Sequence, residues 1–117
     1  FRRDLTLLRL LKRKLFGWQD YDYAQLASSR ESIKPDLIAG MFLLMPREIY
    51  VELQGFDERY WLYFEDADFA RRCRQSGIDL FVYPMVRIIH VGRRAGRKRF
   101  SYALRHYRSM VRYILGF

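Results

Sequence analysis

The sequence of 117 residues has a single cysteine and no long apolar stretch. Cys73 cannot form a disulfide within the chain, and no cysteine and histidine residues have the spacing of a zinc finger, so neither device can hold a small fold together. A reducing compartment is therefore expected. The longest apolar run, residues 38–46, is much shorter than the roughly 18 residues that a membrane-spanning helix needs. The chain opens with Phe1 rather than Met and has no signal-peptide pattern, and we expect it to be a piece of a longer protein.

The chain nevertheless has enough apolar side chains for a hydrophobic core. Half of its residues are hydrophobic and 17% are aromatic. This content excludes an intrinsically disordered tail, because so many large apolar side chains can offset the conformational entropy that is lost on folding. The length is that of one domain at most.

Basic residues gather at both ends of the chain, which has a formal net charge of +9. Residues 1–14 hold six Lys or Arg and one acid, residues 87–117 hold nine and no acid, and the stretch between holds seven bases and twelve acids. This pattern indicates anionic partners, among which nucleic acid, an anionic membrane surface and a phosphorylated substrate remain open. The alternative is a solvated face that only keeps the protein soluble.

Residues 1–35 are expected to form a basic amphipathic helix and a loop linker. Leucines recur at helical spacing before Gly17, while arginines and lysines occupy most other positions. The residues that follow are polar and show no clear period. The helix could pack its leucines on a core or lie on acidic lipid head groups.

Residues 36–117 are expected to combine short strands with flanking helices. Residues 36–45 have the composition of a buried strand, and a short helix opened by Pro46 and capped by Gly55 follows. Two further β-rich runs, residues 78–83 and 86–91, are separated by Pro84, and His90 lies near the end of the second.

The C-terminal segment predicts a second basic amphipathic helix. Its apolar stripe consists of Phe100, Leu104, Tyr107, Val111 and Ile114. Its other side carries Arg105, Arg108 and Arg112.

A cluster of carboxylates opens the helix that is expected to end at Gly77. Acids in a first turn favour the helix dipole, and this explains one or two of Glu65, Asp66 and Asp68 without any function. Three repel one another unless a cation or a shared proton relieves them, so the cluster is a candidate metal ligand or catalytic base. Farther along this helix, Phe69 and Cys73 are expected to face inward, and the arginines outward.

Five aromatic residues lie just before this cluster, between Phe56 and Phe64, and they surround a charged triplet that contains Asp57 and Glu58. Such a stretch, with Trp61 within it, is typical of a pocket wall. A satellite hydrophobic cluster under a loop is an equally good interpretation.

Several motifs in fixed order together resemble the C-terminal half of family 2 glycosyltransferases, which are inverting enzymes with a GT-A fold, and the rhamnosyltransferase-like members in particular. They are Ala39-Gly40-Met41-Phe42-Leu43-Leu44, Gly55-Phe56-Asp57-Glu58, Tyr63-Phe64-Glu65-Asp66-Ala67-Asp68-Phe69, and then Arg72, Gly77, Pro84 and His90. The likeness covers roughly residues 35–115. It implies an α/β fold class, namely the C-terminal part of the GT-A nucleotide-diphospho-sugar transferase fold, with residues 36–117 as the acceptor-binding and catalytic portion.

The resemblance also implies a role for each site residue. Asp66 would be the general base, because inversion needs a carboxylate that removes the proton of an acceptor hydroxyl as its oxygen attacks the anomeric carbon. The acceptor side would include Asp57, Glu58, Trp61, Glu65 and Asp68. The donor side would include Gly40, His90 and Arg94, with His90 also holding the metal, and the arginines and lysine of residues 93–99 would lie near the diphosphate.

One part of the family pattern is absent from the sequence. No strand and helix series for nucleotide binding precedes residue 36. We therefore expect the divalent metal, Mn²⁺ or Mg²⁺, to be bound mostly by a missing N-terminal half, and the chain alone to be inactive.

The implied function is sugar transfer from a nucleotide-sugar donor to a glycan or polyprenyl-diphosphate-linked acceptor in cell-surface polysaccharide or lipopolysaccharide synthesis. The basic helices favour a cytoplasmic, peripheral location at the inner face of the membrane. A homodimer is possible if lost sheet neighbours leave apolar surface exposed. Two alternatives stay open: a basic nucleic-acid-binding module, disfavoured because carboxylates lie among the aromatics and would repel a phosphate backbone, and a catalytically silent membrane-surface module.

Overall fold

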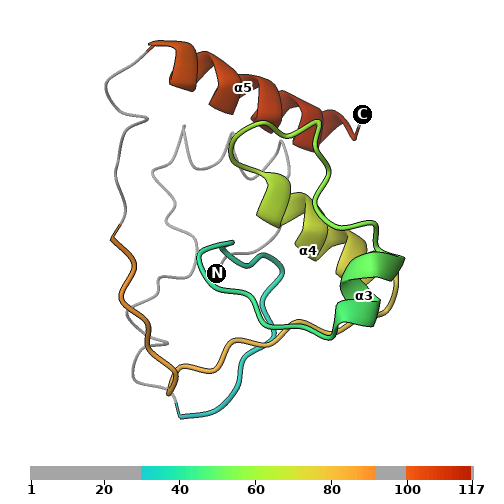
Figure 1. Cartoon of the computed structure of the whole chain (residues 1–117), viewed down its shortest axis with the longest axis vertical. Coiled ribbons are helices and arrows are strands. Elements are labelled where there is room, and N and C mark those ends of the chain that lie inside the picture. Colours follow the sequence, from blue (N-terminus) through green and yellow to red (C-terminus); the bar gives the residue numbers. More distant parts are fainter. Residues whose placement is uncertain (1–29, 92–99, 117) are drawn as a thin grey trace, which may run out of the picture.

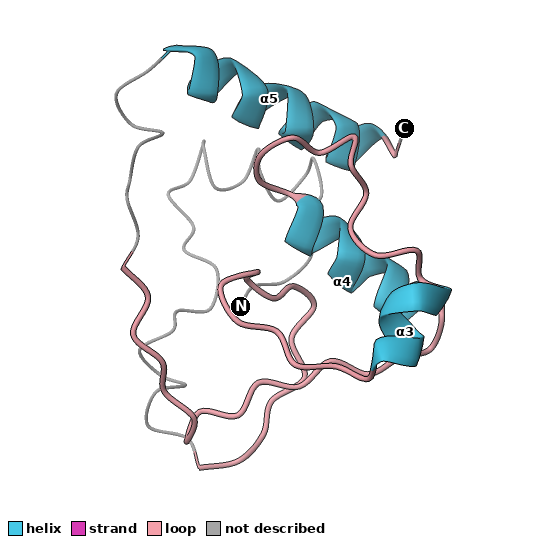
Figure 2. Ribbon diagram, in the orientation of Figure 1, coloured by secondary structure: helices cyan, strands magenta, loops and turns pink. Residues whose placement is uncertain are grey.

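The computed structural model describes residues 30–91 and 100–116. The elements labelled in it are the helices α3 (Arg47–Glu52), α4 (Glu65–Gln75) and α5 (Phe100–Leu115), which are joined by long loops (Figures 1 and 2). None of these helices is both long enough and apolar enough to cross a membrane. The helix expected before Gly17, the linker up to residue 29 and Arg94 lie outside the described residues.

The three expected strands are wrong for this chain. In the described part of the chain, residues 36–45, 78–83 and 86–91 run as loops, and they form no ladder with one another (Figure 2). The β pairing is limited to isolated bridges: Ile33 pairs antiparallel with Val82, with N–H···O distances of 3.0 and 2.8 Å, and Leu37 also takes part in a bridge. A strand needs a neighbour that takes its backbone N–H and C=O groups along several residues, and no such ladder is present among the described residues. The described part of the predicted α/β fold is therefore mostly helical.

The first helix confirms the expected pattern of start and stop residues. Helix α3 begins directly after Pro46 and is followed by Gly55, whose φ is +65°. The Gly55 N–H donates to the Tyr50 carbonyl at 2.8 Å, and an added Cβ would lie 2.9 Å from the Tyr50 ring. Glycine is thus required there both for its backbone conformation and for its lack of a side chain.

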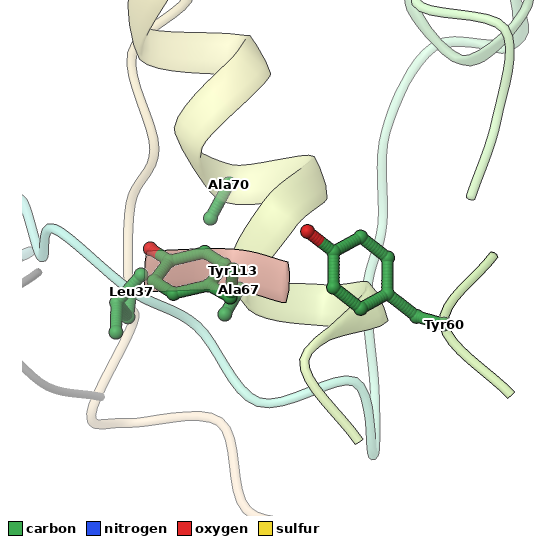
Figure 3. Packing of buried hydrophobic residues seen from close by; sticks show 5 residues of the cluster. All are labelled: Leu37, Tyr60, Ala67, Ala70 and Tyr113. Carbon is green, nitrogen blue, oxygen red and sulfur yellow. The ribbon is translucent and has the colours of Figure 1, made fainter. Parts of the chain in front are cut away.

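The hydrophobic core lies where α4 and α5 meet the loop that precedes α4. Figure 3 shows its five buried members, which are Leu37, Tyr60, Ala67, Ala70 and Tyr113. The two alanines of α4 allow Tyr113 of α5 to approach closely, and Tyr113 is fully buried. A second cluster joins α3 to α4 through the rings of Tyr50, Phe56 and Phe69, whose centroids are 5.3–5.9 Å apart. Phe69 and Cys73 face inward as predicted.

The arginines of α4 do not point into solvent as expected. Arg72 donates to the backbone carbonyls of Leu53 and Gly55, the latter at 2.7 Å, and also to Asp68 at 2.8 Å. Arg71 donates to the Tyr113 carbonyl at 2.7 Å. A guanidinium carries five N–H donors, so one arginine can satisfy several carbonyls that a loop leaves without partners.

Helix α5 is also rotated relative to its predicted apolar stripe. Ser109 and Tyr113 are buried, whereas Leu104 and Tyr107 are 51% and 59% exposed. Ser109 donates its hydroxyl to the Leu62 carbonyl at 3.0 Å. The hydrogen bond of Ser109 and the packing of Tyr113 in the core thus decide which face of α5 is buried. Part of the predicted apolar stripe remains on the surface.

Candidate functional site

The loop before α4 has an unusual backbone. Tyr63 and Phe64 both adopt left-handed conformations, with φ of 63° and 71°. Two consecutive aromatic residues rarely take this conformation, which must be held by surrounding contacts. The Phe64 ring packs on Tyr113 with a centroid distance of 5.4 Å, and the Tyr63 and Phe64 rings both contact His106 of α5. The strained turn sets the direction in which α4 begins and hence where its first carboxylates lie.

Asp66 is held in place by backbone N–H groups. The Gly40 N–H donates to its Oδ2 at 2.8 Å, and the Ala67 N–H donates to its Oδ1 at 2.8 Å. A Cβ on residue 40 would lie 3.3 Å from the Asp66 Cβ, so the absence of a side chain there permits this approach. The structure therefore brings together two of the expected site residues from segments 26 positions apart. Each carboxylate oxygen keeps a second lone pair for another donor.

Glu65 lies beside Asp66 in a less polar setting. Its Oε2 is buried and has no hydrogen-bond partner in the described part of the chain. Burial raises the pKa of Glu65, and the negative charge of Asp66 raises it further, against a hydrogen bond from its own backbone N–H. The two adjacent carboxyl groups therefore have different environments.

The remaining expected acids are bound into structural contacts or exposed. Asp68 pairs with Arg72 at 2.8 Å and thereby helps to attach α4 to the turn after α3. Asp57 forms a bidentate pair with Arg59, which holds the pKa of Asp57 below its ordinary value. Glu58 is exposed in the same loop.

Trp61 forms one wall of a cavity between the loop and α5. The Arg105 guanidinium lies over its ring, 3.4 Å from the centroid. The cavity has a volume of about 570 Å³, and four arginines line it: Arg59, Arg105, Arg108 and Arg112. The sequence indicated a pocket wall around Trp61 and a basic face of α5, but not that the two line one cavity. The contribution of Arg59 could not be found without the fold.

Of the expected donor and metal residues, Gly40 and His90 are among the described residues and Arg94 is not. His90 is exposed near the end of the described segment 30–91. Across the residues that the structure describes, no group of three His, Cys, Asp or Glu side chains is arranged to hold a metal ion. The described residues therefore do not form a metal site by themselves.

Residues 23–108 match the family described as the N-terminal domain of galactosyltransferase, and this match covers well over half of the chain. The chain belongs to this glycosyltransferase family. The matched range includes the Gly40 and Asp66 pair, Trp61 and His90.

Two proteins similar in sequence to this chain are rhamnosyltransferases by name. The chain is 36% identical over 90 residues to Rhamnosyltransferase WbbL of Escherichia coli (strain K12), a range that covers 73% of this chain and 34% of the relative. It is 32% identical over 73 residues to the N-acetylglucosaminyl-diphospho-decaprenol L-rhamnosyltransferase of Mycobacterium tuberculosis (strain ATCC 25618 / H37Rv), covering 62% of this chain and 24% of the relative. The chain thus spans about a third or less of these relatives. No solved structure matches the chain significantly.

The chain has a second cavity, which is lined mostly by apolar side chains and is open to solvent. It has a volume of about 510 Å³ and lies between residues 38–46 and 78–88, with Phe69 and Cys73 at its base. Burial raises the pKa of the Cys73 thiol, so the reactive thiolate is disfavoured. Several side chains around this cavity remain in contact with solvent, and Leu44 is 90% exposed.

Proposed function

We propose that the chain is the acceptor-side, catalytic part of an inverting glycosyltransferase with a GT-A fold. One observation carries the proposal: Asp66 is oriented by the Gly40 N–H at the start of α4, directly after the strained Tyr63 and Phe64 turn. Strained backbone and a fixed carboxylate are typical of active sites, where a group must be held in one productive geometry. Membership in a glycosyltransferase family supports the same reaction class.

Asp66 acts as the general base of this reaction. Its carboxylate accepts the proton of an acceptor sugar hydroxyl while that oxygen attacks the anomeric carbon of the donor. The bond from that carbon to the nucleoside diphosphate breaks, and the diphosphate leaves with the electron pair. The two backbone N–H groups keep the carboxylate aimed without using its remaining lone pairs.

Other residues take supporting roles in the proposal. Glu65 and Trp61 lie on either side of the Tyr63 and Phe64 turn in sequence and help to position the acceptor. Gly40 lies beside the donor sugar, and His90 and Arg94 bind the donor diphosphate. A divalent cation, Mn²⁺ or Mg²⁺, would be bound mostly by residues outside the described ones, with His90 as one ligand.

The acceptor is proposed to be a glycan or a polyprenyl-diphosphate-linked sugar of cell-surface polysaccharide. The name of the mycobacterial relative specifies an acceptor of that chemistry, a diphospho-decaprenol carrying N-acetylglucosamine. The enzyme would then work on the cytoplasmic face of the membrane, where a peripheral protein can reach a lipid-linked substrate. The chain spans only about a third of the Escherichia coli relative. We therefore expect that sugar transfer needs further donor-binding residues that this chain does not contain.

The test is sugar transfer by the longest gene product that contains this sequence. The assay supplies Mn²⁺ or Mg²⁺, a panel of nucleotide sugars and a lipid-linked acceptor extract, and it compares wild type with Asp66→Asn. Loss of the base is expected to lower the rate by about 10²-fold or more with the fold intact. Asp79→Asn is the matched control, because Asp79 is an exposed carboxylate that pairs with Lys34 on the surface. If Asp66→Asn transfers as fast as this control, the base is wrongly assigned.

A further inference from the structure

The cavity beside Trp61 combines positive charge with aromatic surface. Its lining contains four arginines together with Trp61 and Tyr107, and no carboxylate. Helix α5, which supplies most of the lining, has no acidic residue in its 16 positions. Guanidinium groups bind phosphate oxygens in bidentate fashion, and several of them around one cavity produce a strong positive potential.

Contacts with the loop hold this cavity in shape. Arg112 donates to the Arg59 carbonyl at 2.6 Å, and Ser109 donates to the Leu62 carbonyl at 3.0 Å. Asp57 fixes Arg59 through a bidentate pair, with distances of 2.7 and 2.9 Å to its Oδ2. The Arg105 guanidinium lies over the Trp61 ring, 3.4 Å from its centroid. Three of the four guanidinium groups are thus oriented before any ligand arrives, which reduces the entropy lost on binding.

The mixed lining indicates the kind of ligand. Trp61, Tyr107 and Val111 offer apolar surface beside the guanidinium groups. A free phosphate would use only the charges, whereas an amphiphile with a diphosphate between a sugar and a hydrocarbon chain would use both surfaces. The volume of about 570 Å³ falls within the usual range for small-molecule sites. The loop that lines the cavity continues directly into Glu65 and Asp66.

We propose that this arginine cavity binds the diphosphate of a polyprenyl-linked acceptor and so presents the acceptor sugar to Asp66. This inference rests on the proposed function, which requires an acceptor at Asp66. Arg108 is the most direct contact to test, because it is exposed and makes no ion pair with any other described residue.

The first experiment measures binding of inorganic pyrophosphate by calorimetry to the longest gene product that contains the sequence. Arg108→Gln and Arg105→Gln are each expected to weaken binding at least fivefold. Arg47→Gln removes the same charge from the exposed start of α3 and is expected to change binding less than twofold. Equal weakening by all three variants would show general charge attraction and overturn the proposal, as would failure of wild type to bind pyrophosphate at millimolar concentration.

The second experiment identifies the source of the phosphate. Vesicles that contain a polyprenyl diphosphate are expected to bind wild type more tightly than vesicles of equal charge made with phosphatidylglycerol, and Arg108→Gln should remove that difference. Equal binding to both vesicles would identify a general lipid surface and overturn the diphosphate site. Asp66→Asn is expected to bind pyrophosphate as tightly as wild type. The transfer assay therefore tests the assignment of Asp66 as the base, and the pyrophosphate assay separately tests the diphosphate site.

Discussion

At the residue scale, the contact between Gly40 and Asp66 places the candidate base. The Gly40 N–H donates to the Asp66 carboxylate, and a side chain at position 40 would crowd the Asp66 Cβ. Neither residue could be placed beside the other from the sequence, because 26 residues separate them. The left-handed turn at Tyr63 and Phe64 then decides the direction from which Asp66 approaches Gly40.

Gly40→Ala is expected to impair transfer more than stability. The new Cβ would lie 3.3 Å from the Asp66 Cβ, so the aspartate must shift by a few tenths of an ångström. Misplacement on this scale is expected to slow transfer about 10-fold, whereas stability changes by at most about 1 kcal/mol. The control is Gly77→Ala, whose Cβ meets nothing but which strains a backbone with φ of +73°. That control should lose stability and keep its rate per folded molecule; the opposite pattern would contradict the assigned contact.

Glu65 is expected to make the stability of the folded chain depend on pH. Because its folded-state pKa is raised, the folded chain holds the proton at pH values where the unfolded chain has released it. This contribution to stability is complete below the unfolded-state pKa and is lost as pH rises through the folded-state pKa. Glu65→Gln should therefore gain stability relative to wild type as pH rises above the ordinary pKa of a glutamate, as measured by urea unfolding. The exposed Glu52→Gln is the control, and a parallel pH profile for both variants would contradict the assignment.

At the element scale, Arg72 joins two helices that are not otherwise paired by backbone bonds. It connects α4 to the carbonyls of Leu53 and Gly55 and also binds Asp68. The i, i+4 pair with Asp68 could be predicted from the helix, but the two carbonyls belong to a turn whose position only the fold supplies.

Arg72→Met is expected to destabilise the chain by about 2–3 kcal/mol, since it removes charged hydrogen bonds from a half-buried position. Lys34→Met removes the exposed pair with Asp79 and is expected to change stability by less than about 1 kcal/mol. Chemical unfolding of both variants gives the comparison. A similar small loss in each would mean that the Arg72 contacts contribute no more than a surface ion pair.

The exposed side of α5 is expected to bind anionic membranes. Leu104, Tyr107 and Leu115 are exposed on a helix that also carries three arginines. Each basic residue near an anionic surface contributes about 1 kcal/mol, and added salt screens that attraction. Flotation with phosphatidylglycerol vesicles should therefore show binding that weakens as salt rises, and Leu104→Ser should weaken it further. Absence of binding at low salt would exclude the membrane role.

At the scale of the whole molecule, the described residues expose more apolar surface than a lone domain normally does. Leu44 and Ile89 are 90% and 96% exposed, and both belong to segments whose composition is typical of buried strands. Segments of this kind are buried when strands pair along both of their edges and other elements, usually helices, cover both faces of the sheet. The absence of such neighbours among the described residues explains both the wrong strand predictions and the exposed surface.

The chain by itself is therefore expected to associate with a second copy. Ile89→Lys should shift the sedimentation coefficient towards that of a monomer, because it places a charge on the exposed apolar surface. Val51→Lys, at a position 60% exposed on α3, is the control and should leave association unchanged. A monomeric wild-type chain at 0.1 mM would contradict this prediction.

Local sequence alone determined the three described helices and their ends. Gly55 and Gly77 stop α3 and α4, and the periodic segment after residue 100 forms α5, because propensity and turn chemistry act within a few residues. The motifs in fixed order also indicated a glycosyltransferase that resembles rhamnosyltransferases, and the family match and the two relatives support that coarser statement. Only the tertiary structure decided which side of α5 is buried, that Gly40 meets Asp66, and that Arg59 joins the α5 arginines around one cavity. These features depend on contacts between segments far apart in the chain, and such contacts depend on how the whole fold packs rather than on local residue preferences.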